Sequence, residues 1–345
     1  MGKRPDGTKD KDSELQRTVS FVDAPGHETL MAVMISGASI MDGALLLIAA
    51  NETCPQPQTR EHLAALQIAG IENIVIVQNK VDLVTRERAI ESHKEISEFV
   101  SGTIAEEAPI IPVSAHHDVN LDILIQAVEA KIPTPERGDE NGMMHIARSF
   151  DINRPGTRPA GLKGGIIGGS IVRGKFSQGD EVIIAPGRRS SQGSKQKWTP
   201  IETRIMSMKG GGLELKEMNA GGLCGISTPL DPAMTKADNL SGQVMARKGE
   251  VPPIWEVMSL DLTLLERMVA SEEGKADKVK PLALNEMLMV NAATATSVGV
   301  VNKVSKGVTT LSLRLPICAT VGSRVTLSRR IDSRWRLIGH GTISG

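Results

Sequence analysis

Three short polar stretches of this sequence carry residue types that bind a charged, planar ligand. They are Asp23-Ala24-Pro25-Gly26-His27, Asn79-Lys80-Val81-Asp82 and Ser114-Ala115-His116, and each follows an apolar run. An apolar run that ends in a polar loop is typical of a strand in a parallel sheet, which delivers ligand-binding groups to the carboxyl edge of the sheet. We therefore expect the three stretches to form one binding site at that edge.

The first stretch has the chemistry of a phosphate and metal site. Asp23 could hold a water of a Mg²⁺ shell, because Mg²⁺ keeps several waters and takes few protein carboxylates. Pro25-Gly26 would let the backbone approach a terminal phosphate, since glycine has no Cβ. His27 is placed to orient an attacking water. An Asp-x-Pro-Gly sequence alone is more often only a turn, so this prediction depends on the other two stretches.

The second and third stretches have the chemistry of a guanine site. Asp82 can accept both N–H donors on the guanine edge, and adenine lacks that donor pair. Asn79 would tie the loops together, the Lys80 stem would cover the base, and the backbone of Ser114-Ala115 would offer N–H groups to the guanine oxygen. The predicted base-binding residues are Asn79, Lys80, Val81, Asp82, Ser114, Ala115 and His116. All three stretches in this order predict the back half of a GTP site.

The elements that must position these loops alternate along the first third of the chain. The expected strands are Thr18–Val22, Ala44–Ala50, Ile74–Gln78 and Ile110–Val113. The expected helices are Glu28–Gly37, Arg60–Ala69 with Thr59 as its N-cap and Gly70 closing it, Arg86–Val100 and Leu121–Lys131. This alternation predicts a parallel, doubly wound α/β sheet, in a GTP-binding domain over residues 1–135.

The pattern changes after Lys131, where a Pro-rich linker is followed by short alternating strands separated by glycines. Such strands are typical of antiparallel barrels. The sequence Val251-Pro252-Pro253 interrupts the series, so we expect two β-barrel domains, at residues 143–248 and 249–345.

Composition limits the remaining possibilities. The 345 residues suffice for two or three domains with full cores. Lys+Arg and Asp+Glu both count 40, so no global basic field indicates nucleic acid, and any RNA contact must be local. Cys54, Cys224 and Cys318 form no Cys-x-x-Cys pair, which argues against a disulfide framework or a zinc knuckle. The longest apolar run, Ala44–Ala50, is too short to cross a bilayer, so we expect a cytoplasmic protein with no membrane partner.

Two local groups of cations could contact RNA phosphates. They are Arg188, Arg189, Lys195 and Lys197, and Arg329, Arg330, Arg334 and Arg336. A solvated barrel face is the favoured interpretation of the first group. The second group is open between the two roles, because Arg334 and Arg336 alternate on a strand and point to one side.

With these residues laid out, the chain resembles the gamma subunit of archaeal and eukaryotic translation initiation factor 2, an elongation-factor-Tu-like GTPase family. The resemblance runs from about Arg17 to the C-terminus. It is carried by Ser20–Leu30, Ala49–His62, Val77–Leu83, Arg148–Thr157, Leu162–Ser170, Leu230–Pro232, Thr235–Leu240 and Arg334–Arg336.

The resemblance implies a GTP-binding domain followed by two β-barrels, with GTP or GDP and Mg²⁺ as cofactors. It implies delivery of initiator methionyl-tRNA to the small ribosomal subunit, a heterotrimer with alpha and beta subunits, and GTP hydrolysis after start-codon selection. By position, Asp23 and Gly26 would sense Mg²⁺ and the γ-phosphate, and His27 would lie at the water-orienting, catalytic position.

The sequence departs from the family in the region before Asp23. It contains no Gly-x-x-x-x-Gly-Lys-Ser/Thr phosphate loop, and no switch-I threonine can be placed before Asp23. The sheet would then lack its first two strands, one of them central. We expect an N-terminally truncated product that binds guanine nucleotide weakly by itself. Two alternatives stay open: a non-catalytic tRNA- and subunit-binding adaptor with a degenerate GTP-binding domain, and an elongation factor of the Tu or selenocysteine type.

Overall fold

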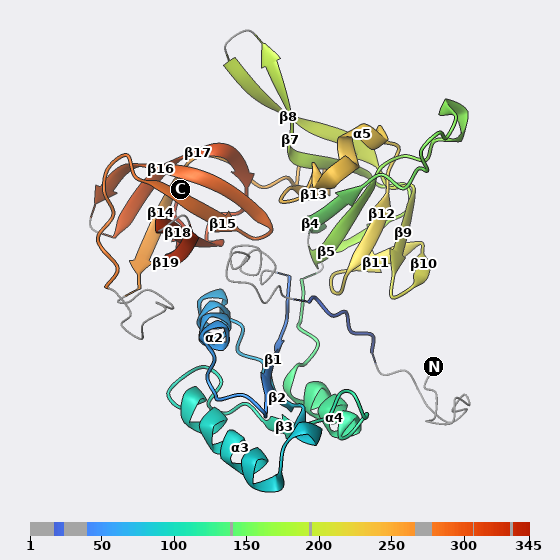
Figure 1. Cartoon of the computed structure of the whole chain (residues 1–345). Helices are drawn as coiled ribbons and strands as arrows, with labels where there is room; N and C mark the ends of the chain where they lie inside the picture. The colour runs from blue at the N-terminus through green and yellow to red at the C-terminus, as the bar shows by residue number, and fades with distance from the viewer. Residues whose placement is uncertain are drawn as a thin grey trace.

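The computed structural model of the chain describes residues 17–23, 40–138, 141–192, 195–265, 278–305, 307–331 and 334–345. Figure 1 shows a sheet flanked by helices at the bottom and two antiparallel β-structures above it. The predicted helix Glu28–Gly37 and the site residues Ala24, Pro25, Gly26 and His27 lie outside the described residues. None of the described helices is long and apolar enough to cross a membrane.

The N-terminal third is a parallel sheet with helices on both faces. Its strands are β1 (Ala44–Ala49), β2 (Ile74–Asn79) and β3 (Ile110–Pro112), in the order β1-β2-β3. Its helices are α2 (Pro57–Ala69), the 3₁₀ turn η2 (Val81–Leu83), α3 (Arg86–Val100) and α4 (Leu121–Lys131). Leu46, Ile76 and Ile96 belong to one core cluster between the sheet and the helices α2 and α3, and α4 lies on the opposite side (Figure 1). The predicted alternation of strands and helices is confirmed for these elements.

The helix ends show which local signals were reliable. Gly70 closes α2 in the left-handed conformation (φ 74°), as predicted. The predicted N-cap Thr59 is wrong, because α2 begins at Pro57, with Gln56 as its N-cap. Proline suits the first helical position, since its missing N–H would have no partner there. Helix α3 begins after Thr85, whose side chain accepts a hydrogen bond from the Arg88 N–H.

The predicted strand Thr18–Val22 is not formed. The Arg17 guanidinium donates to the Ile132 carbonyl just beyond α4 (2.6 Å), and the Ser20 hydroxyl accepts from the Leu223 N–H in the second domain (3.1 Å). A strand needs a neighbour that pairs its backbone groups, and the described parallel sheet holds only β1, β2 and β3.

The middle of the chain forms an eight-stranded antiparallel sheet wrapped around one core. The strands of this sheet and of a separate two-stranded sheet are β4 (Met143–Phe150), β5 (Ile166–Arg173), β6 (Lys175–Ser177), β7 (Glu181–Gln192), β8 (Lys195–Arg204), β9 (Ser207–Gly210), β10 (Leu213–Leu215), β11 (Glu217–Asn219), β12 (Cys224–Ser227) and β13 (Val244–Arg247). The sheet order is β10-β9-β12-β5-β4-β13-β7-β8, and β6 pairs with β11. Short helical turns η3 (Pro159–Gly161), α5 (Pro232–Thr235) and η4 (Lys236–Asp238) lie in its connections. Met144, Ile167, Phe176 and Ile226 are buried together inside it.

The C-terminal third is a closed antiparallel barrel, as predicted. Its strands are β14 (Ile254–Leu264), β15 (Met287–Ala292), β16 (Ala295–Ser305), β17 (Val308–Cys318), β18 (Arg324–Ile331) and β19 (Arg334–Ile343). They close in the order β14-β17-β16-β15-β18-β19. Leu260, Val290, Leu311 and Leu327 are fully buried in its core. The three cysteines are free, and Cys224 and Cys318 are buried, as small apolar residues would be.

Helix α2 is the contact between the parallel-sheet domain and the barrel. Ala65 and Ile68 pack against Leu337 of β19, and Arg336 pairs with the buried Glu61 at 3.1 Å. Arg336 therefore joins two domains of the chain, which corrects its candidate role as an RNA-binding residue. Arg329 of the same basic group also forms an ion pair within the chain, with Glu286.

His145 lies at the junction between the middle domain and the barrel. It is on β4, opposite Val244, and Val244 packs in a cluster with Cys318 of the barrel. The His145 Nδ1 is buried without a hydrogen-bond partner among the described residues. Burial, and next the nearby Arg173 guanidinium, lower the pKa of His145 from 6.5 to about 4.

We expect this histidine to make the protein less stable in mild acid. Between pH 6.5 and about pH 4, His145 is protonated in the unfolded chain and neutral in the folded chain. The free energy of unfolding therefore falls as the pH is lowered through this range, by roughly 3 kcal/mol at its lower end. Urea denaturation of the native protein and of His145→Gln at a series of pH values measures this, with a shallower slope expected for the variant. His93→Gln, at an exposed position on α3, should keep the native slope; equal slopes in all three proteins would contradict the assignment.

Candidate nucleotide-binding site

The two base-binding stretches predicted from the sequence start at the same edge of the parallel sheet. Gln78 of β2 and Pro112 of β3 are in register, so both strands end side by side. The Val113 N–H donates to the Gln78 carbonyl (2.8 Å), and the Val81 N–H donates to the Val113 carbonyl (3.3 Å). Backbone hydrogen bonds alone therefore join the loops that follow, residues 79–83 and 113–119.

Asn79 holds these loops together through its side chain. Its Oδ1 accepts from the Lys80 N–H at 2.8 Å and from the Ala115 N–H at 3.2 Å. Lys80 adopts the left-handed conformation (φ 62°), which turns the chain sharply after β2 and leaves Lys80 exposed. The Ala115 N–H, which was expected to face a guanine oxygen, here donates to Asn79.

Asp82 is the charged group of the site. It lies in η2, and the buried Ser114 is its hydrogen-bond partner; that bond is the main reason why the pKa of Asp82 is below its usual value. The carboxylate is thus ionised at neutral pH, and it then acts only as an acceptor. The guanine edge, with two adjacent N–H donors, is a ligand that such a carboxylate can bind with both oxygens.

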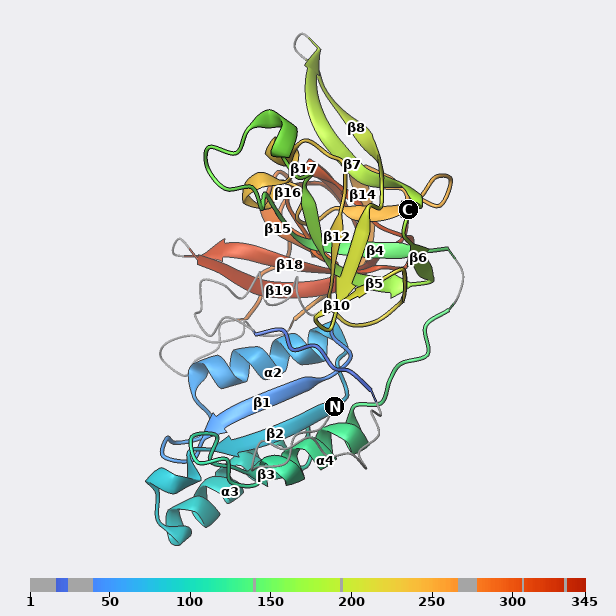
Figure 2. The ribbon, with the colours of Figure 1, turned by 90° about the vertical axis from the view of Figure 1, so that its right-hand side faces the viewer.

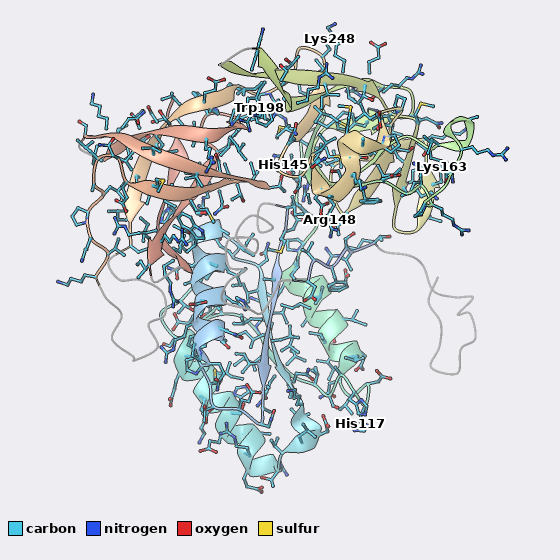
Figure 3. All side chains as sticks on the ribbon, turned by 45° about the horizontal axis from the view of Figure 1, so that its top comes forward. His117, His145, Arg148, Lys163, Trp198 and Lys248 are labelled. Atoms are coloured by element: carbon cyan, nitrogen blue, oxygen red, sulfur yellow. The ribbon has the colours of Figure 1, made fainter. Side chains whose placement is uncertain are left out.

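His117 was not among the predicted site residues, but the structure brings it to Asp82. Its Nε2 lies 3.8 Å from the Asp82 Oδ2, and its ring meets that of His116 edge to face, with centroids 4.7 Å apart. Ser114 and Val119 form a β-bridge that folds the loop back on itself, and no sequence spacing signals this fold. Figure 3 shows His117 at the end of the domain far from the barrels.

A third loop reaches the same edge after β1. The Ala50 N–H donates to the Asn79 carbonyl (2.8 Å). Farther along this loop, the Cys54 N–H donates to the Glu95 carboxylate of α3 at 2.8 Å. Arg88 binds the same carboxylate at 2.6 Å, and its hydrogen bond is the main reason why the pKa of Glu95 is below its usual value. Helix α3 thus fixes the loop that follows β1, an arrangement that sequence reasoning missed.

The phosphate end of the predicted site is not assembled in the described residues. Asp23 ends the segment that Arg17 docks beyond the C-terminal end of α4. Because α4 starts from the loop after β3 and runs back along the sheet, that docking point is at the amino edge, opposite the loop of Asn79. Among the described residues, no three His, Cys, Asp or Glu side chains cluster as a metal site would. The described contacts of the segment that Asp23 ends, from Arg17 to the Ile132 carbonyl and from the Leu223 N–H to Ser20, lie away from the loops of Asn79 and Ser114.

Two parts of the chain match known protein families. Residues 11–134 match the family described as the elongation factor Tu GTP binding domain. Residues 256–343 match the family described as initiation factor eIF2 gamma, C terminal. Together the two matches cover more than half of the chain.

Individual relatives agree with the family matches. Translation initiation factor 2 subunit gamma of Methanocaldococcus jannaschii is 53% identical over 335 residues, which cover 97% of this chain and 81% of the relative. The same subunit of Haloquadratum walsbyi is 52% identical over 340 residues, covering 98% and 82%. The chain belongs to the gamma-subunit family of translation initiation factor 2. This family is a translational GTPase family, so the predicted family, fold class and class of activity are confirmed.

Solved structures agree on the fold. Translation elongation factor SelB from Methanococcus maripaludis, in complex with the GTP analogue GppNHp, has a TM-score of 0.72 and 20% sequence identity, covering 94% of this chain and 70% of SelB. At that identity the likeness shows the fold alone. The much higher identity to initiation factor 2 decides between the initiation-factor prediction and its elongation-factor alternative.

Proposed function

We propose that the carboxyl edge of the parallel sheet binds the base of GTP, and that Asp82 selects guanine. The observation that carries this proposal is the Asn79 side chain, whose Oδ1 accepts from the N–H groups of Lys80 and Ala115 and so holds both loops in place beside Asp82. A carboxylate held in position loses little freedom when it binds a ligand. Lys80, exposed beside it, would lie along the base.

The phosphate end of the site is proposed from the residue pattern alone. Asp23 would hold Mg²⁺ through a water, Gly26 would contact the γ-phosphate, and His27 would orient the attacking water, with Ala24 and Pro25 shaping the turn. Mg²⁺ would neutralise the phosphate charge when nucleotide is bound. Since the structure does not bring Asp23 to the guanine loops, we derive no catalytic step from this group.

The partners are proposed from membership of the family. The chain would act in the cytoplasm with alpha and beta subunits, bind initiator methionyl-tRNA in its GTP state, and deliver it to the small ribosomal subunit, with hydrolysis after start-codon selection. Preference for initiator methionyl-tRNA over elongator tRNAs, measured by filter binding with GTP present, tests this part. Equal binding of both tRNAs would contradict it.

A titration with fluorescent GDP tests guanine binding directly. We expect weak binding by the 345-residue chain and at least 1,000-fold tighter binding, about 4 kcal/mol, by a version extended upstream with a phosphate loop, because that loop supplies most N–H donors to the β-phosphate. Fluorescent ADP is the matched control, and the extended version should bind it much more weakly than it binds fluorescent GDP. If the extended version also fails to bind GDP, the adaptor alternative replaces the GTPase proposal.

A further inference from the structure

The hairpin of β7 and β8 extends well beyond the sheet that carries it. β13 pairs with β7 only from Val182 to Ala185, whereas β7 and β8 continue to pair with each other out to Gln192 and Lys195. Figures 1 and 2 both show this ribbon projecting from the top of the middle domain, on the side opposite the helical domain. We call residues 186–200 the ribbon arm. Beyond Ala185 no other described strand pairs with β7 or β8, and Arg188, Arg189 and Lys197 are exposed to any partner on that side.

The base of the ribbon arm is held in one position. The Gly187 N–H donates to the Gln243 Oε1 at 2.8 Å, and the Gln243 Nε2 donates back to the Gly187 carbonyl at 3.1 Å. Gln243 is buried, with 7% of its surface exposed. Gly187 has φ +91°, and a Cβ there would meet the Thr199 carbonyl oxygen at 2.0 Å, so only glycine fits. These contacts therefore fix the base of the ribbon arm against the sheet.

The ribbon arm is basic in a chain that has no net charge. Between Pro186 and Pro200 the sequence has the cations Arg188, Arg189, Lys195 and Lys197 and no Asp or Glu, while the whole chain has 40 residues of each sign. Within the described part of the chain, no ion pair engages Arg188, Arg189 or Lys197, although Arg329 and Arg336 of the other basic group are both paired. In the described part of the chain, Arg188, Arg189 and Lys197 are therefore available to a partner, whereas Arg329 and Arg336 are engaged within the chain.

The cations lie on both faces of the ribbon arm. Arg188 and Arg189 are consecutive on β7, so their side chains point to opposite faces. Ser190 is opposite Lys197, which puts Lys197 on the face of Arg188. Arg189 is opposite Trp198 on the other face. A narrow ribbon that is positive on both faces suits a ligand with negative charges on two sides of it, and the phosphates that border a groove of an RNA duplex have that arrangement.

We propose that the ribbon arm binds the phosphate backbone of RNA. Arginine and lysine supply most protein contacts to nucleic-acid phosphates, and such contacts need no base sequence. This interaction requires neither guanine nucleotide nor the aminoacyl end of a tRNA, so it goes beyond the proposed GTP site. A basic ribbon could instead contact an acidic protein or protect an exposed strand edge against self-association. The experiment below distinguishes these two roles from RNA binding.

The test measures binding of the full chain, without nucleotide, to a fluorescent RNA duplex of about 20 base pairs with unacylated ends, by anisotropy over a range of salt. The variant Arg188→Ala/Arg189→Ala/Lys197→Ala is expected to bind at least about tenfold more weakly, and its slope of log K against log salt should be smaller by about two to three. The matched control Lys209→Ala/Lys216→Ala/Arg314→Ala removes the same charge from other exposed cations. It should retain native affinity.

Three results would overturn the proposal. The control could lose as much affinity as the arm variant, which would mean that only net charge matters. Polyglutamate could compete as well as unlabelled RNA, which would indicate an acidic protein partner. The arm variant could keep RNA binding but self-associate in light scattering, which would indicate edge protection. Native circular dichroism and an unchanged thermal midpoint of the arm variant establish that the fold is intact, so a negative result concerns the arm alone.

Discussion

Replacing Asp82 with asparagine should weaken GDP binding about 100-fold, close to 3 kcal/mol, and create binding of xanthosine diphosphate. The carboxylate accepts from two guanine N–H donors, whereas an amide offers one oxygen and leaves its own N–H₂ facing the guanine amino group. Xanthine has a carbonyl at that place, which the amide can donate to. Competition against fluorescent GDP, in the chain extended by a phosphate loop, measures both affinities.

The control for this experiment is Asp122→Asn. Asp122 is exposed in the first turn of α4, after the loop 113–119, so the substitution makes the same change of charge at a residue that is not proposed to contact the base. It should leave both affinities unchanged. If Asp82→Asn binds GDP as the native protein does, the base does not bind at the carboxyl edge of β2 and β3.

Replacing Arg336 with methionine is expected to lower the free energy of unfolding by about 3 kcal/mol. Only 6% of the Glu61 side chain and 18% of the Arg336 side chain are exposed, so the substitution leaves a buried carboxylate without this cation. Methionine keeps the apolar stem that packs beside α2. Chemical denaturation, with hydrogen exchange of the α2 amides, measures the loss and locates it at the interface.

A double variant and an exposed pair make this test specific. Glu61→Gln/Arg336→Met should recover about 1–2 kcal/mol over the single variant, because the buried charge is gone. The pair of Lys248 and Glu202 has side chains that are 75% and 71% exposed, and Lys248→Met should cost less than about 1 kcal/mol. Equal losses from Lys248→Met and Arg336→Met, or unchanged exchange in α2, would contradict a structural role of the Glu61 pair.

Local signals in the sequence were sufficient for the elements around the guanine loops. The helices α3 and α4 have the predicted bounds, because their apolar spacing and end residues act within a few positions of each other. The placing of Asn79 and Asp82 after a buried strand also followed from the sequence, since a buried strand in a parallel sheet is a continuous apolar run. The position of His117 beside Asp82 depends on a loop that folds back, and no periodicity encodes it.

By itself, the sequence predicted the family, the alternation of strands and helices and the closed C-terminal barrel, because short-range patterns and motif spacing encode all of these. Tertiary structure alone decided contacts between distant residues. Thr18–Val22 has the composition of a strand, yet pairing depends on a neighbour elsewhere in the chain, and the described sheet offers it none. Likewise, Glu61 and Arg336 are 275 positions apart, so only the folded chain shows that Arg336 is an interdomain residue while Arg188 and Arg189 stay available to a partner.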